Sequence, residues 1–173
     1  MNALYERILL YRIQKLADRK AFEVVYDTYR QRIARFLHVK ISDQEVVADL
    51  LNEVFLKAWR YLRDDEPVEH LQALLFQIAR MSVADYYRCR ADVQMTALDS
   101  EEAEQVPSKE VPAEQLDSKM KVERVRQALP KLKESYREAI VLRYFEEMSI
   151  EEIALALEKS PGTVRVLIHR AVS

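Results

Sequence analysis

Glycine is almost absent from this sequence, in which Gly162 is the single glycine among 173 residues. Strand-rich folds need glycine in their turns, and phosphate-binding loops need it for close backbone approach, so sandwiches, barrels, dinucleotide-binding folds and P-loops are disfavoured. Cysteine is equally scarce. Cys89 is the single cysteine, so it has no partner for an internal disulfide. No apolar run approaches the roughly 18 residues that a membrane-spanning helix requires. The sequence therefore predicts an all-α protein of a reducing cytoplasm, with no membrane insertion.

Charged residues are unevenly distributed along the chain. Residues 1–90 carry 15 lysines and arginines against 13 acidic residues, residues 91–118 carry 1 against 8, and residues 119–173 carry 11 against 8. The acidic stretch contains Pro107 and Pro112 but no aromatic residue, which is typical of a flexible linker. We therefore expect two small helical domains, 1–90 and 119–173, joined by the acidic linker 91–118. The linker is either a solvated tether or a segment whose carboxylates lie in a basic channel of a partner.

Apolar residues in the first domain recur at the spacing of amphipathic helices. A leading helix is expected over residues 4–16, followed by a helix around residues 22–36, another from about Asp43 to Leu62, and a last one over about 68–90. Ser42, with Glu45 three residues later, has the form of a capping box at the start of the third of these helices. The expected inward-facing residues are Phe22, Val25, Tyr26, Tyr29, Ile33 and Phe36, then Val47, Leu50, Leu51, Val54, Ala58, Tyr61 and Leu62, then Leu71, Leu74, Leu75, Ile78, Val83 and Tyr86.

The second domain ends in the outline of a helix-turn-helix. Two amphipathic helices are expected over residues 122–129 and 134–145. Ser149 and Glu152 then predict a capping box that opens a helix over 150–157, and Pro161 occupies the first turn of a terminal helix. Burying Val164, Ile168 and Ala171 against Ile150, Ile153, Ala154 and Leu157 would leave an outward set of Thr163, Arg165, Val166, His169 and Arg170. Such a set suits phosphates and guanine edges, although an ordinary helical hairpin with a basic face has the same pattern.

Two surfaces of the first domain are ambiguous on spacing alone. Opposite one buried stripe lie Asp49, Asn52, Glu53, Leu56 and Arg60, a polar face with an apolar centre that a plain solvated helix also shows. The following helix interleaves Phe76, Arg80, Tyr86, Tyr87, Arg88 and Arg90. Aromatic rings beside guanidinium groups suit unpaired nucleic-acid bases, and they equally suit core aromatics beside a basic helix end.

The patterns of known catalytic sites are missing from the sequence. It contains no GxSxG or HExxH motif, and His38, His70 and His169 have no carboxylate or nucleophile arranged beside them for catalysis. We therefore expect a protein that is not an enzyme.

Five segments, in order, resemble the extracytoplasmic-function (ECF) group of bacterial RNA polymerase sigma factors. Three of these segments are DLLNEVFLKAWRYL (49–62), LLFQIARMSVADYYRCR (74–90) and SIEEIALALEKSPGTVRVLIHRA (149–171). AFEVVYDTY (21–29) is similar to the opening helix of that family, and LPKLKESYREAIVLRYF (129–145) to the segment before its helix-turn-helix. One departure is that the turn of the family commonly carries glycine where Glu158 follows Leu157 here.

This resemblance implies a sigma factor that binds core RNA polymerase, recognises promoter DNA as duplex and as melted strand, and starts transcription without a metal or cofactor. It implies an anti-sigma protein as a further candidate partner. The implied polymerase-binding residues are Asp49, Asn52, Glu53, Phe55, Leu56, Trp59 and Arg60. Those implied for the minus-ten element are Arg80, Asp85, Tyr86, Arg88 and Arg90, and those for the minus-thirty-five element are Ser160, Gly162, Thr163, Arg165, His169 and Arg170.

Two other classes of protein remain compatible with the residues themselves. A DNA-binding regulator that acts without polymerase would use the helix-turn-helix but leave the face around Glu53 idle. An adaptor or anti-sigma-like protein would use its helical faces for protein contacts alone and show no dependence on DNA.

Overall fold

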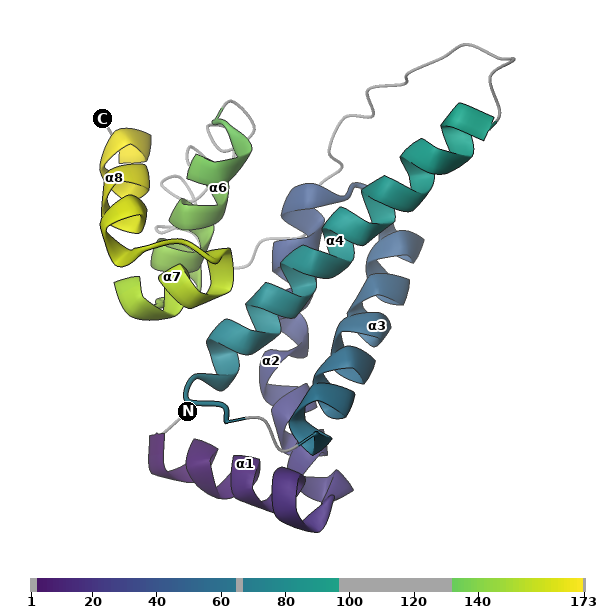
Figure 1. Cartoon of the computed structure of the whole chain (residues 1–173), viewed down its shortest axis with the longest axis vertical. Helices are drawn as coiled ribbons and strands as arrows, with labels where there is room; N and C mark the ends of the chain where they lie inside the picture. The colour runs from purple at the N-terminus through teal and green to yellow at the C-terminus, as the bar shows by residue number, and fades with distance from the viewer. Residues whose placement is uncertain (1–2, 65–66, 97–131, 173) are drawn as a thin grey trace, which may run out of the picture. The chain divides into compact units, whose positions relative to one another are not determined.

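The computed structural model describes residues 3–64, 67–96 and 132–172 (Figure 1). Within these ranges every regular element is a helix, which confirms the predicted all-α class. The chain divides into two compact units, Met1–Val106 and Pro107–Ser173. The predicted linker from residue 97 to residue 118 and the predicted helix over 122–129 lie outside the described residues. The proposed domain boundaries therefore stay a prediction.

Four helices form the first unit: α1 (Ala3–Leu16), α2 (Arg19–Lys40), α3 (Gln44–Arg63) and α4 (Leu71–Thr96). Helix α3 packs against both α2 and α4, and α2 also packs against α4. Figure 1 shows α1 crossing one end of these three longer helices. Helix α4 begins three residues later than expected and continues to Thr96, so the first residues of the predicted linker are helical.

The core of this unit is built mainly from the predicted stripes, with two differences on α3. Phe36 and Phe76 are both 1% exposed, and their rings meet edge-on with centroids 5.4 Å apart. Phe55, which lies outside the predicted stripe, is only 4% exposed, whereas Tyr61, which was expected inside, is 40% exposed. The buried arc of α3 is wider and turned relative to the prediction because α3 packs against three helices, α1, α2 and α4.

Carboxylate caps begin two helices of the first unit. Asp18 accepts hydrogen bonds from the backbone N–H groups of Lys20 and Ala21 at the start of α2. The hydrogen bond from Arg12, reinforced by the Ala21 amide, lowers the pKa of Asp18. Asp43, not the expected Ser42, caps α3, because its carboxylate accepts from the backbone N–H groups of Glu45 and Val46.

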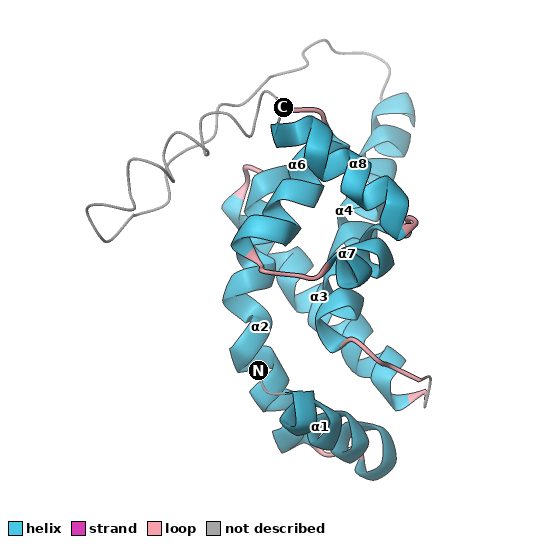
Figure 2. Ribbon diagram, turned by 90° about the vertical axis from the view of Figure 1, so that its left-hand side faces the viewer, coloured by secondary structure: helices cyan, strands magenta, loops and turns pink. Residues whose placement is uncertain are grey.

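The second unit contains α6 (Glu134–Ile140), a π-helical turn η2 (Val141–Phe145), α7 (Ile150–Leu157) and α8 (Pro161–Val172) (Figure 2). Helix α6 passes directly into η2, so the helix predicted over 134–145 is continuous but widens in its last five residues. Helix α8 packs against α6 and α7. Among the described residues of the unit, the fully buried side chains are Ala139, Leu142, Met148, Ile153 and Val164.

Both helices of the helix-turn-helix begin at a side-chain cap. The Ser149 N–H donates to Glu152 Oε2 at 2.8 Å, and the Glu152 N–H donates to Ser149 Oγ at 3.1 Å, which confirms the capping box. Ser160 Oγ accepts from the Thr163 N–H at 3.2 Å, so Ser160 caps α8 in front of Pro161. The helix-turn-helix of this unit is therefore fixed largely by its own sequence.

The residue that ends α7 carries a conformational cost. Glu158 has φ 54° and ψ 46°, the left-handed region that favours glycine. Its N–H donates to the Leu155 carbonyl at 3.2 Å, and the Lys159 N–H donates to the Ala154 carbonyl at 2.9 Å, which is the hydrogen-bond pattern of a Schellman cap. The backbone of this turn thus has the form that glycine usually supplies.

Glu158→Gly is expected to stabilise the second unit by about 1 kcal/mol relative to Glu158→Ala, since both changes remove the carboxylate but only glycine removes the Cβ strain. Amide hydrogen exchange of α7 and α8 in the full chain measures the difference. The slowest amides should exchange about fivefold more slowly in the glycine variant. Equal exchange rates in the two variants would show that the left-handed turn carries no strain.

Candidate functional site

Four of the residues predicted to bind polymerase form an exposed strip along α3. Asp49, Asn52, Leu56 and Arg60 follow one another at helical spacing and are all exposed, with the Leu56 side chain 50% exposed at the centre. Glu53 lies between them and is half-buried. We call these five residues the α3 face. An apolar residue ringed by polar ones is the usual composition of a protein-binding surface.

The two predicted aromatic residues lie beneath or beside this face. Phe55 packs edge-on against Tyr26 of α2, with ring centroids 4.7 Å apart, and belongs to the core. Trp59 is half-buried and meets Phe22 at 5.1 Å. The burial of Phe55 leaves it no side-chain surface for a partner, so it supports the α3 face from below.

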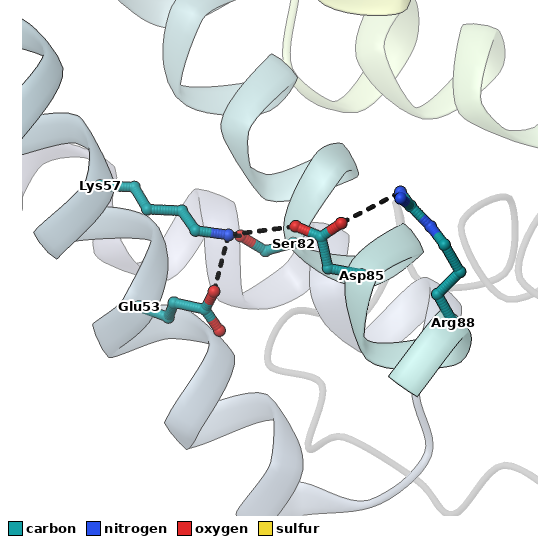
Figure 3. A network of polar contacts seen from close by, with 5 residues as sticks. All are labelled: Glu53, Lys57, Ser82, Asp85 and Arg88. Atoms are coloured by element: carbon teal, nitrogen blue, oxygen red, sulfur yellow. Dashed lines mark hydrogen bonds and ion pairs between the residues drawn. The ribbon is translucent and has the colours of Figure 1, made fainter. Parts of the chain in front are cut away.

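A chain of alternating charges connects the α3 face to α4 (Figure 3). The Lys57 ammonium lies 2.6 Å from Glu53 Oε1, one turn earlier on α3, and 3.3 Å from Asp85 Oδ2 on α4. It also donates to Ser82 Oγ at 3.2 Å. Asp85 in turn accepts from Arg88 at 3.0 Å. The hydrogen bond with Glu53, followed by that with Asp85, raises the pKa of Lys57, so its charge persists at neutral pH.

Sequence reasoning missed Lys57. Its spacing from Glu53 is the favourable i, i+4 arrangement of a helix, which the sequence does contain. The partner on α4 depends on how α3 and α4 pack, and no sequence pattern reports that contact. The structure therefore adds a residue that lies between two predicted surfaces and belongs to neither.

The second half of α4 gathers four of the five residues predicted to contact the minus-ten element. Arg90 donates to the Tyr86 hydroxyl at 3.0 Å, and the Tyr86 and Tyr87 rings meet at 5.3 Å. The Tyr87 hydroxyl donates to the backbone carbonyl of Lys40 at 2.8 Å and so ties α4 to the end of α2. We call Asp85, Tyr86, Tyr87, Arg88 and Arg90 the α4 end, and the helix itself continues for six residues beyond Arg90. It presents two partly exposed rings beside two exposed guanidinium groups.

Arg80 and Phe76 lie further back along α4. Arg80 is half-buried, one turn or more before the α4 end. Phe76 is 1% exposed and contacts Phe36, so the interpretation of Phe76 as a core residue is the correct one. Phe76 is therefore closed to a ligand, whereas Arg80 keeps part of its side chain exposed.

In the second unit, α8 turns the predicted residues outward. Val164 is fully buried and Ile168 and Ala171 are half-buried, as the packing of a helix-turn-helix demands. The exposed residues of α8 include the whole predicted outward set, which is Thr163, Arg165, Val166, His169 and Arg170. With Ser160 and Gly162 at the start of the helix, these residues form what we call the α8 face.

The surroundings of Arg165 and of Gly162 bear on how the α8 face could contact a ligand. The Arg165 guanidinium lies 3.7 Å from Glu151 Oε1 at the start of α7, and both side chains are more than half exposed. Such a solvent-exposed pair is weak and leaves the guanidinium available. A Cβ on Gly162 would meet nothing closer than Ser160 Oγ at 3.9 Å, so packing within the unit does not require glycine there.

No helix in the described ranges combines the length and the apolar character that crossing a bilayer requires.

Comparisons with known proteins agree with this arrangement. The family model described as "Sigma-70, region 4" matches residues 122–173, which include α6, α7 and α8. RNA polymerase sigma factor YlaC of Bacillus subtilis (strain 168) is 31% identical over 156 residues, covering 90% of this chain and 90% of that protein. The ECF RNA polymerase sigma-E factor of Escherichia coli (strain K12) is 30% identical over 177 residues, covering 97% of this chain and 91% of its own.

Two solved structures share the fold. The sigma factor RpoE of Bartonella quintana, in complex with the anti-sigma factor NepR, matches with a TM-score of 0.70 and 25% identity, covering 88% of this chain and 92% of that chain. CnrH, in complex with the cytosolic domain of CnrY, matches with a TM-score of 0.69 and 24% identity, covering 97% and 92%. The matched lengths show that the likeness extends over both units of the chain.

Proposed function

The chain belongs to the extracytoplasmic-function group of RNA polymerase sigma factors, and from that premise we propose how its surfaces divide the work of starting transcription. A member of this group binds core RNA polymerase and directs promoter recognition, DNA melting and initiation. The observations that carry the assignment are the 31% identity to RNA polymerase sigma factor YlaC over 90% of both chains and the 30% identity to an ECF RNA polymerase sigma-E factor over 97% of this chain. The roles of individual residues and the domain boundaries 1–90, 91–118 and 119–173 are our proposals.

The α3 face is proposed to bind core polymerase. Its exposed leucine supplies apolar area that can be buried, and Asp49 and Glu53 supply carboxylates for basic side chains of the partner. The aromatic layer of Phe22, Tyr26 and Phe55 beneath the face holds α3 rigidly against α2. A rigid, preorganised surface loses little side-chain and backbone freedom when a partner binds.

The α4 end is proposed to hold the melted minus-ten strand. Unpaired bases can stack on Tyr86 and Tyr87, while Arg88 and Arg90 neutralise the phosphates beside them. Stacking contributes about 1–3 kcal/mol for each captured base, which is enough to offset the cost of unpairing a few base pairs. The melted strand would then be trapped as it opens, and no bond chemistry is needed.

The α8 face is proposed to read the minus-thirty-five element in the major groove, as the second helix of a helix-turn-helix does. Arg165 and Arg170 can donate to guanine edges or phosphates, and Thr163 and Ser160 can donate to phosphates at the start of the helix. The open space around Gly162 lets a phosphate backbone come close to α8.

The two DNA-reading surfaces act together because polymerase holds both. The chain has a formal net charge of −2, so its free affinity for DNA is expected to be low and sensitive to salt. Bound to polymerase, each surface meets its promoter element at a high effective concentration. This division of labour requires no catalytic group on the chain, and it places the chain in the cytoplasm with the polymerase.

An inhibitor of the anti-sigma class is proposed as a second partner. The related RpoE was solved with the anti-sigma factor NepR. A partner helix lying on the α3 face would compete with polymerase for the same exposed leucine and carboxylates.

Fluorescence anisotropy of labelled promoter DNA tests the proposed function. The chain alone should bind weakly and with little sequence preference, and adding purified core polymerase should give tight, sequence-dependent binding. Tight duplex binding by the chain alone would instead support a regulator that acts without polymerase. Binding of the chain to core polymerase that is the same with and without DNA would support an adaptor protein.

A further inference from the structure

Lys57 lies between the α3 face and the α4 end and makes contacts to both. Its ammonium is 2.6 Å from Glu53, which belongs to the α3 face, and 3.3 Å from Asp85, which belongs to the α4 end. Figure 3 shows the Lys57 side chain reaching from α3 to α4, with Glu53 on one side of its nitrogen and Asp85 on the other. Neither surface was predicted to include it.

All three N–H groups of this ammonium have an acceptor. A lysine ammonium has three donors, and here the acceptors are Glu53, Asp85 and the hydroxyl of Ser82. Ser82 is fully buried, so it fixes the nitrogen at the boundary between the two helices. An ammonium held in this way responds to a change at one carboxylate by altering its contact with the other.

The contact between Asp85 and Arg88 extends this series of ion pairs by one more residue. Arg88 lies 3.0 Å from Asp85 Oδ1, and its side chain is 74% exposed. Asp85 is therefore shared between Lys57 and Arg88, so a closer contact with one cation weakens its attraction for the other. An arginine released from this carboxylate can bind a phosphate instead.

From these contacts we propose that Lys57 is a positioning residue that couples polymerase binding at Glu53 to DNA binding by Arg88. A basic side chain of the polymerase that pairs with Glu53 competes with Lys57 for that carboxylate, which is the nearer of the two that contact the Lys57 ammonium. Lys57 then moves closer to Asp85, and Arg88 is released toward the melted strand. This coupling rests on the proposed function of the two surfaces.

The coupling is reciprocal and modest. Linkage requires that DNA strengthen polymerase binding by the same factor by which polymerase strengthens DNA binding. Because the contacts are partly exposed ion pairs, Lys57 is expected to contribute about twofold to fivefold to this factor. A merely structural ion pair between α3 and α4 would change stability without changing the factor.

The test measures the affinity of the full chain for purified core polymerase with and without a promoter fork whose minus-ten strand is unpaired. The ratio of the two affinities is the coupling factor. Lys57→Met should lower it about twofold to fivefold, and Lys57→Arg, whose longer cation can still reach both carboxylates, should restore most of it. Ser82→Ala, which keeps the charge but removes the anchor, should lower it by less.

A double variant shows whether Lys57 acts through Arg88. Arg88→Gln alone should lower the coupling factor by at least as much as Lys57→Met, and Lys57→Met combined with Arg88→Gln should lower it no further than Arg88→Gln alone. An unchanged factor in Lys57→Met with native helix content, or losses that multiply in the double variant, would overturn the inference. Failure of the unaltered chain to bind polymerase would overturn the proposed function, and this coupling with it.

Discussion

Glu53→Lys is expected to lower the affinity of the chain for core RNA polymerase at least about 30-fold, which corresponds to 2 kcal/mol or more. The reason is that the change removes a carboxylate from the α3 face and places a positive charge where polymerase is proposed to present basic groups. Within the chain the cost is small. A like-charge pair with Lys57 at i, i+4 on a partly exposed helix destabilises by only about 0.2–0.5 kcal/mol.

Asp27→Lys is a matched control for this prediction. It makes the same charge change on an exposed position of α2 and likewise disrupts an intrahelical ion pair, here with Arg30 at 3.9 Å. This variant should bind polymerase with the affinity of the unaltered chain. Equal loss of binding in both variants would attribute the effect to net charge, and normal binding by Glu53→Lys would remove the α3 face from the polymerase interface.

Arg165→Ala is expected to reduce transcription from a promoter with a favourable minus-thirty-five element by about 5-fold to 150-fold at limiting sigma factor. This range corresponds to the 1–3 kcal/mol that a well-placed arginine contributes at a guanine edge. The measurement is initial transcript yield with purified polymerase on matched promoter templates. Scrambling the minus-thirty-five element should make the variant and the unaltered chain nearly equal.

Glu151→Ala separates the two contacts of Arg165. It removes the ion pair at 3.7 Å but leaves the guanidinium free to meet DNA, so transcription should stay the same or rise. If Glu151→Ala instead reproduced the loss seen with Arg165→Ala, the arginine would act by holding α7 against α8. An unchanged preference for the minus-thirty-five element in Arg165→Ala would remove that residue from DNA reading.

The helices and the helix-turn-helix could be predicted because their signals are local. The capping box of Ser149 and Glu152 needs only residues three apart, and the buried position of Val164 follows from the apolar stripe of α8. The outward direction of Arg165 then follows from the geometry of the helix. These features depend on neighbouring residues of one segment, so the sequence contains them directly.

Features that depend on competition or on packing could not be predicted in the same way. The side chains of Ser42 and Asp43 can both cap a helix. The path of the backbone determines which of them accepts hydrogen bonds from the first N–H groups of α3, and here it is Asp43. Phe55 is buried because α3 contacts more than one neighbouring helix, which widens its buried arc. Lys57 was missed because its link to Asp85 joins residues 28 apart in sequence.

Run-off transcription with purified core polymerase tests the central claim most directly. Core polymerase is supplied with a library of promoter fragments, with and without the chain, and the 5′ ends of the transcripts are mapped. The account predicts discrete start sites that appear only when the chain is present, each at a fixed distance from a shared pair of upstream elements. Start sites identical to those of core polymerase alone would contradict it.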